Sequence, residues 1–154
     1  MKLLDHLVME SVSSKLKSAH KREVIGELVG KLRIYGAVDI ENEEDIINAI
    51  AEREQIGSTG IGNGIGIPHC KTDLIDKVIC TVGISENGIN FDALDDQPVH
   101  VFFLVLAPLA PEVNHLSLLA KIASMLRSKY FVNDLKKCRN DDELRDLIVR
   151  EENR

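Results

Sequence analysis

Apolar residues at helical spacing predict two amphipathic helices in the first third of the chain. In the first, charged residues separate the apolar ones and Gly36 offers a stop, so we expect a helix over residues 19–35. The same spacing returns around Ile46 and Ile50, behind three acidic residues that favour a helix start. It predicts a second helix over about residues 42–55.

Continuous apolar runs predict strands in the middle of the chain. Residues 78–84 are rich in β-branched side chains, and residues 99–106 form an almost uninterrupted apolar run between two prolines. Such a run is typical of a strand that is covered on both faces. Residues 86–88 and 95–98 have the composition of turns and flank a short apolar segment at 89–91.

Helical spacing returns in the last third of the chain. An apolar stripe runs from Leu116 to Leu126, and a last helix is predicted to open at Asn140, where Glu143 follows at capping-box spacing. Helices around a strongly buried sheet predict an α/β fold. We expect one three-layer domain spanning residues 1–154, with a mixed β-sheet flanked by helices on both faces.

Size and charge narrow the classes of partner. The 154 residues can bury a core of their own, and the formal charge of −6 argues against nucleic acid as the main partner. The basic residues gathered between positions 121 and 139 are interpreted as solvated helix faces. We expect a cytoplasmic protein without membrane insertion, because no apolar run approaches the ~20 residues of a bilayer span, the start does not resemble a secretory signal, and the cysteines are widely spaced.

Residues 57–69 are the most informative segment for function. Glycine occupies every second position from Gly60 to Gly66, so an extended segment would present one face of bare backbone. Such a face lets a partner protein or a phosphoryl group come close, and Pro68 fixes the chain direction before His69. The same pattern is equally typical of a structural turn that ends in an incidental histidine.

Common phosphate-binding and metal-binding patterns do not fit this segment. A dinucleotide-binding fingerprint and a P-loop would each need glycine where Ile65 stands. No Cys-x-x-Cys pair and no histidine pair at helical spacing supports a metal site, so we expect neither cofactor nor metal. Cys70 and His69 would point to opposite sides of an extended chain, so we expect a buried, inert thiol.

His69 remains as the candidate nucleophile. Imidazole has an unperturbed pKa near 6.5, so at neutral pH one ring nitrogen can attack while the other is held as a donor. This chemistry suits reversible phosphoryl transfer, whose product needs positive or hydrogen-bonding neighbours. A hydrolase that uses His69 as a transient acceptor is disfavoured, because the sequence shows no acid or metal cluster for activating water.

Three motifs, in order along the chain, carry a resemblance to a known family. Residues 53–69 resemble the active-site motif of the fructose/mannitol-type enzyme IIA domains of the bacterial phosphoenolpyruvate-dependent phosphotransferase system, in particular their nitrogen-regulatory branch. Residues 91–99 and 115–123 resemble the family's second and third motifs, so the resemblance covers nearly the whole chain. Gly66 departs from the alanine common in the family, and Asn114 stands where the nitrogen branch varies.

The resemblance implies roles for three residues. His69 corresponds to the histidine that a small histidine-containing phosphocarrier protein phosphorylates, His115 to a second histidine beside the phosphoryl group, and Arg53 to an arginine beside the pocket. Physical chemistry supports these roles. The N-terminal end of a helix near His115 would stabilise a negatively charged phosphoryl group, and Arg53 carries a permanent positive charge. On sequence alone, both are also compatible with ordinary helix surfaces.

Together these observations predict a phosphoryl carrier with a phosphohistidine intermediate, which has no turnover without its partners. No transporter or sugar-binding segment accompanies the motifs, so we expect a stand-alone nitrogen or metabolic regulator. One alternative is a sugar-uptake component that passes phosphate to an enzyme IIB. Another is a binding regulator of a transporter or sensor kinase; an acceptor that removes phosphate from His69 would distinguish a relay from such a switch.

Overall fold

The sheet is built around its longest pair of strands. In the computed structural model, which describes residues 1–154, β4 (Ile79–Ile89) pairs antiparallel with β5 (Val99–Ala107). On its other side β5 pairs in parallel with β2 (Ile65–Gly66) and then with β3 (His69–Lys71). β1 (Gly60–Gly62) pairs antiparallel with β2 and completes a mixed, five-stranded sheet.

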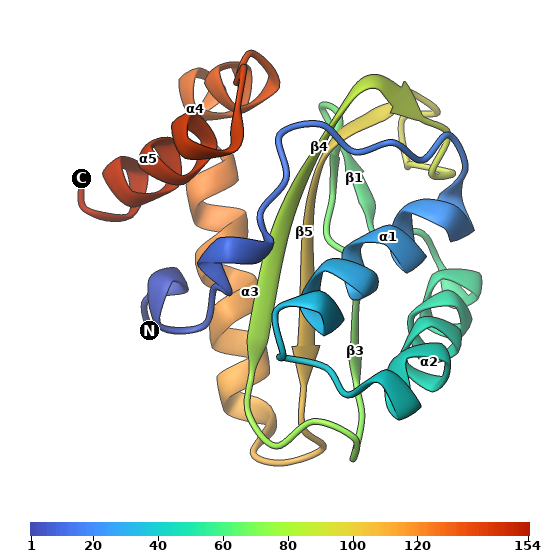
Figure 1. The fold of residues 1–154 in the computed structure, drawn as a ribbon. Coiled ribbons are helices and arrows are strands. Elements are labelled where there is room, and N and C mark those ends of the chain that lie inside the picture. Colours follow the sequence, from blue (N-terminus) through green and yellow to red (C-terminus); the bar gives the residue numbers. More distant parts are fainter.

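Helices cover both faces of this sheet. They are α1 (Lys21–Ile34), α2 (Glu43–Ile56), α3 (Glu112–Leu126), α4 (Lys129–Lys136) and α5 (Asp141–Glu152), with single 3-10 turns at Leu3–Asp5, Met9–Ser11 and Ile40–Asn42. α1 and α2 lie on one face and α3 on the other, with α4 and α5 beside α3 (Figure 1). This confirms the predicted three-layer α/β fold. None of the helices combines the length and the apolar character needed to cross a bilayer.

Alternation along β5 explains its continuous apolar run. Phe103 and Val105 belong to the core cluster under α3, α4 and α5, whereas Phe102 and Leu104 belong to the cluster under α1 and α2. All four side chains are fully buried, and burying each one stabilises the fold by roughly 1.5–3 kcal/mol. Because helices cover both faces of β5, neither face is polar, and its sequence does not alternate between polar and apolar residues.

Several predicted elements differ from the structure at their ends. α3 starts at Glu112, a turn before the apolar stripe, and α4 was not predicted. The predicted turn at 86–88 is wrong, because these residues lie within β4 at a register shift between Ile84 and Ile89. The capping role of Asn140 is confirmed, since its side-chain oxygen accepts a hydrogen bond from the Glu143 backbone N–H at 2.8 Å.

The glycine segment forms a hairpin instead of one extended strand. Asn63 and Gly64 have φ values of 58° and 78°, as a two-residue hairpin turn requires, and separate β1 from β2. The expected bare face is also wrong at Gly60, where a Cβ atom would lie 2.8 Å from Ala93 Cβ. At Gly66 a Cβ atom would lie 3.2 Å from the Val99 side chain. These glycines allow close packing within the chain, and the strand after the turn leads to His69.

Candidate active site

His69 opens β3 with one ring nitrogen already engaged. Its Nδ1 lies 2.7 Å from the backbone carbonyl oxygen of Ile67. A carbonyl can only accept, so Nδ1 carries the proton and donates it, which leaves the lone pair of a neutral imidazole on Nε2. The half-buried ring is held in place, because parallel pairing with Val105 on β5 fixes its backbone.

His115 lies directly beside this ring. The two ring centroids are 5.4 Å apart and the planes meet at 77°, an edge-to-face contact. His115 belongs to the first turn of α3, is only 4% exposed, and its Nδ1 has no hydrogen-bond partner. Burial, reinforced by the nearby charges of His69 and Lys71, lowers the pKa of His115 to about 4. His115 is therefore neutral at pH 7. The tautomer with its proton on Nε2 places a lone pair, and not an N–H group, at the buried and unpartnered Nδ1.

Arg53 brings positive charge to the site from the last turn of α2. Its Nη1–H donates to the carbonyl oxygen of Gly57 at 2.8 Å, which ties it to the end of its own helix. Burial lowers the pKa of His69 below 6.5, partly offset by the hydrogen bond to Ile67. The charge of Arg53 lowers that pKa further, whereas the charge of Glu54 raises it. These effects favour the neutral form of the His69 imidazole at physiological pH.

A buried charge network behind this site was missed by sequence reasoning. The carboxylate of Glu54, with its side chain 3% exposed, accepts hydrogen bonds from the backbone N–H and the hydroxyl of Thr59. Lys21 on α1 pairs with the same carboxylate at 3.0 Å, and its Nζ lies 4.6 Å from the centroid of the Phe91 ring. The network holds the start of the glycine hairpin against α2. Spacing offered a signal, since Glu54 follows the buried Ile50 by four residues and so shares its helix face.

A second ion pair joins the two histidine-bearing elements. Lys71, two residues after His69, pairs with Glu112 at 2.8 Å, and Glu112 is the first residue of α3. This hydrogen bond and the charge of Lys71 hold the pKa of Glu112 below its usual value. The pair ties β3 to the helix start that carries His115.

Cys70 and two further histidines, His20 and His100, take no part in this cluster. The predicted burial of Cys70 is confirmed, and burial raises the pKa of its thiol to about 12. His100 uses Nδ1 to contact the carbonyl oxygen of Ser85 at 2.9 Å, and His20 is exposed on the surface. No three His, Cys, Asp or Glu side chains converge so as to hold a metal ion.

Comparison with known sequences places these features in a family. A family model described as "Phosphoenolpyruvate-dependent sugar phosphotransferase system, EIIA 2" matches residues 5–151. The chain is 34% identical to the nitrogen regulatory protein of Klebsiella oxytoca, over 97% of this chain and 91% of that protein. It is 32% identical to the fructose-specific EIIA component of Haloferax volcanii, over 92% of this chain and 90% of that protein. It is also 30% identical to the fructose-specific EIIABC component of Bacillus subtilis, covering 96% of this chain but spanning only 23% of that longer protein.

Solved structures share the fold. The nitrogen regulatory protein IIA-Ntr of Neisseria meningitidis superimposes with a TM-score of 0.83 at 24% identity, covering 94% of this chain and 97% of that one. A chain in the complex of mannitol enzyme IIA with phosphorylated enzyme IIB from Escherichia coli superimposes with a TM-score of 0.75 at 21% identity, covering 91% of this chain and 94% of that one.

Proposed function

The chain belongs to the EIIA 2 family of the phosphoenolpyruvate-dependent sugar phosphotransferase system, and on this basis we propose that it carries a phosphoryl group on Nε2 of His69. The observation that carries the proposal is the hydrogen bond between His69 Nδ1 and the Ile67 carbonyl. It selects the tautomer with a free Nε2 and orients the ring. Burial and Arg53 keep that ring unprotonated near pH 7.

The transfer balances without any cofactor. The Nε2 lone pair of His69 attacks the phosphorus of a phosphohistidine on the donor protein, and a new P–N bond forms as the donor's P–N bond breaks. The electron pair of the broken bond returns to the donor nitrogen. His69 keeps its Nδ1 proton on the Ile67 carbonyl throughout, so alignment and charge stabilisation are the main contributions asked of the protein.

His115 and Arg53 stabilise the transferred group. A neutral His115 with its proton on Nε2 is a hydrogen-bond donor beside the His69 ring, and the first turn of α3 adds the positive end of the helix dipole. Arg53 supplies a permanent positive charge and a planar fork of donors. Both residues interact more favourably with the phosphorylated state than with the free one, because the phosphoryl group brings negative charge to the site.

Exposed apolar side chains around the site support a protein as donor. Val113 and Leu116 flank His115 on α3 and are 63% and 57% exposed. Ile56, one turn after Arg53, is 85% exposed. Exposed apolar side chains grouped around polar reacting groups are typical of a protein-docking surface. We propose that a histidine-containing phosphocarrier protein docks here.

The onward step has two candidate forms. Similarity to nitrogen regulatory proteins favours a regulatory role in which phosphorylation changes binding to a transporter or sensor kinase. Similarity to fructose-specific components favours onward transfer to an enzyme IIB. We place the regulatory form first, because the chain is 34% identical to a nitrogen regulatory protein over 97% of its own length.

Radiolabelled phosphoenolpyruvate, with the system's first enzyme and a histidine phosphocarrier, tests the proposal. We expect acid-labile label on the wild-type protein, none on His69→Ala, and slower labelling of Arg53→Gln. His100→Ala is the matched control, because His100 lies outside the cluster and should label normally. Label that survives in His69→Ala, or no label on the wild type, would overturn the proposal. Loss of label to an added enzyme IIB would favour the sugar-type relay.

A further inference from the structure

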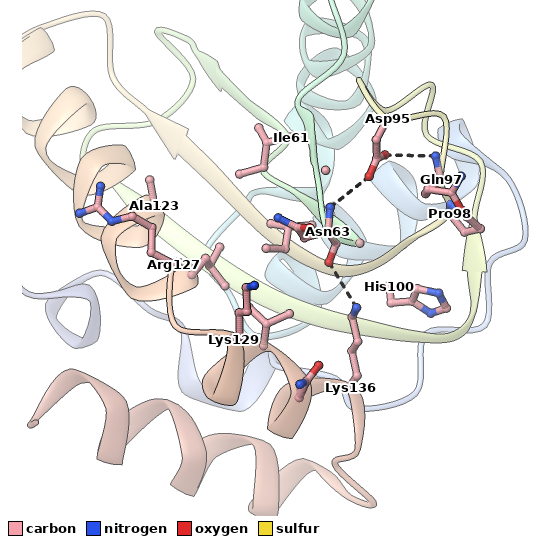
Figure 2. Close-up of a pocket in the computed structure, with 16 residues that line it drawn as sticks. Ile61, Asn63, Asp95, Gln97, Pro98, His100, Ala123, Arg127, Lys129 and Lys136 are labelled. Atoms are coloured by element: carbon pink, nitrogen blue, oxygen red, sulfur yellow. Dashed lines mark hydrogen bonds between the residues drawn. The ribbon is translucent and has the colours of Figure 1, made fainter.

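A large groove lies away from His69, between the glycine hairpin and the helices α3 and α4. Its volume is about 750 Å³, within the usual range of small-molecule sites. Its walls come from the hairpin turn around Asn63, from the loop and strand at 95–100, and from the C-terminal end of α3 with α4 (Figure 2).

The groove is separate from the candidate active site. Ile65 in its wall pairs with Val101, whereas His69 pairs with Val105, so the two lie about 13 Å apart along the sheet. On the helix side, twelve residues separate His115 from Arg127, which corresponds to roughly 18 Å along α3. A molecule of modest size in the groove would therefore not touch the two histidine rings.

Three cationic side chains line the groove in a chain whose formal net charge is −6. They are Arg127, Lys129 and Lys136, which belong to the basic segment between positions 121 and 139. Arg127 and Lys129 make no ion pair, and Lys136 Nζ donates only to the backbone carbonyl of Asn63 at 3.2 Å. Figure 2 shows Lys129 and Lys136 reaching from α4 toward that turn.

The only carboxylate in the lining is already engaged. Asp95 accepts hydrogen bonds from the backbone N–H groups of Asn63 at 3.2 Å and of Gln97 at 3.1 Å. In Figure 2 its carboxylate faces the turn and not the amines of Lys129 and Lys136. The groove thus offers a cationic wall whose charges are not neutralised by the chain itself.

We propose that this groove binds a small metabolite that carries a phosphate group. A phosphate monoester has close to two negative charges at neutral pH and three acceptor oxygens, which match two lysine amines and a guanidinium. The groove is much larger than a phosphate ion, and Pro98, Val132 and Leu126 give the organic part an apolar surface. A bound phosphate would compete with the Asn63 carbonyl for Lys136, at the turn whose second strand leads to His69.

Titration of the isotopically labelled protein with glycerol 3-phosphate, followed by NMR, tests this assignment. Potassium chloride at matched ionic strength is the reference. We expect saturable shifts centred on Asn63, Lys129 and Lys136. The double variant Lys129→Gln/Lys136→Gln should weaken binding at least about tenfold, since it removes two charge-assisted hydrogen bonds. Lys137→Gln is the matched control, because Lys137 ends the same helix outside the groove and should leave the affinity unchanged.

Three results would overturn the proposal. The first is the absence of saturation, or shifts that potassium chloride reproduces, and the second is equal affinity in the double variant. The third is a set of shifts centred on His69 and His115, which would assign the phosphate to the phosphoryl site. Because His69→Ala removes the phosphoryl acceptor and leaves the groove intact, unchanged groove binding in that variant separates this inference from the proposed function.

Discussion

The rings of His69 and His115 meet edge to face, with centroids 5.4 Å apart, although the two residues belong to a strand and a helix that are distant in sequence. Each ring is neutral at pH 7 for a physical reason that the structure supplies, burial first and nearby positive charge second. His69 could therefore accept a phosphoryl group on Nε2 without first losing a proton from that atom, and the Nε2–H of His115 could donate a hydrogen bond to the group. This relationship underlies the predictions for both histidines.

His115→Ala should slow phosphoryl transfer while leaving the fold intact. A hydrogen bond to a charged group contributes about 1.5–3 kcal/mol, so the transfer rate should fall roughly tenfold to a hundredfold. Rapid-quench kinetics with a phosphorylated carrier protein measures the rate, and circular dichroism checks the fold. Unchanged kinetics in a folded variant would remove His115 from the mechanism.

Burial of His115 also predicts how stability depends on pH. The pKa of His115 is lowered from 6.5 to about 4 in the folded protein. Between pH 4 and pH 6.5, His115 is therefore protonated in the unfolded chain and neutral in the folded protein. Stability should therefore rise with pH across this window, by about 1–2 kcal/mol after solvent screening of the charged ring. Urea unfolding of wild type and His115→Gln at several pH values measures the contribution. A variant with the same slope as wild type would contradict it.

Glu54→Gln should destabilise the protein and lower the pKa of His69. Without the Glu54 charge, Lys21 keeps only the exposed carboxylate of Asp92 and the Phe91 carbonyl, at a cost of about 2–3 kcal/mol. The change also removes the negative charge that raises the His69 pKa. Urea unfolding and NMR titration of the His69 ring measure the two effects. Adding Lys21→Met should cost less in Glu54→Gln than in wild type. Additive losses, with an unmoved His69 pKa, would show that the network does not act on the site.

Gly60→Ala should destabilise the fold by about 1–3 kcal/mol, because the new methyl group would lie 2.8 Å from Ala93 Cβ. Gly57→Ala is the matched control: no atom lies within 4 Å of a Cβ there, and its φ of 170° is ordinary extended backbone. We expect that control to stay within about 0.5 kcal/mol of wild type. Equal stability of the two variants in urea would contradict the packing role of Gly60.

The sequence predicted those parts of the molecule whose local pattern and tertiary environment agree. β5 is apolar at every buried position and α2 has a regular stripe, so both elements were predicted close to their observed ends. Sequence reasoning left a turn and an extended segment equally open in the glycine segment, because alternating glycines suit both. The Asn63–Gly64 pair is a strong hairpin signal that would have favoured the turn. α4 was missed because a helix of 8 residues gives too short a periodic signal.

Within the site, sequence reasoning found the residues whose chemistry is visible in their type. His69, His115 and Arg53 were predicted from motifs. In the structure the two histidine rings contact each other, and the charge of Arg53 lowers the pKa of His69. The Glu54–Lys21 pair was missed, because it depends on how α1 packs against α2 on the same face of the sheet. Such partners are set by tertiary packing, which local spacing does not encode.

The most direct test of the central claim locates the phosphate on the protein. After phosphorylation by the carrier protein, nitrogen and phosphorus NMR of the histidine-labelled chain should show a P–N bond at Nε2 of His69, with the Nδ1 proton retained at the Ile67 carbonyl. Phosphate on Nδ1 of His69, or on any other residue, would contradict the account.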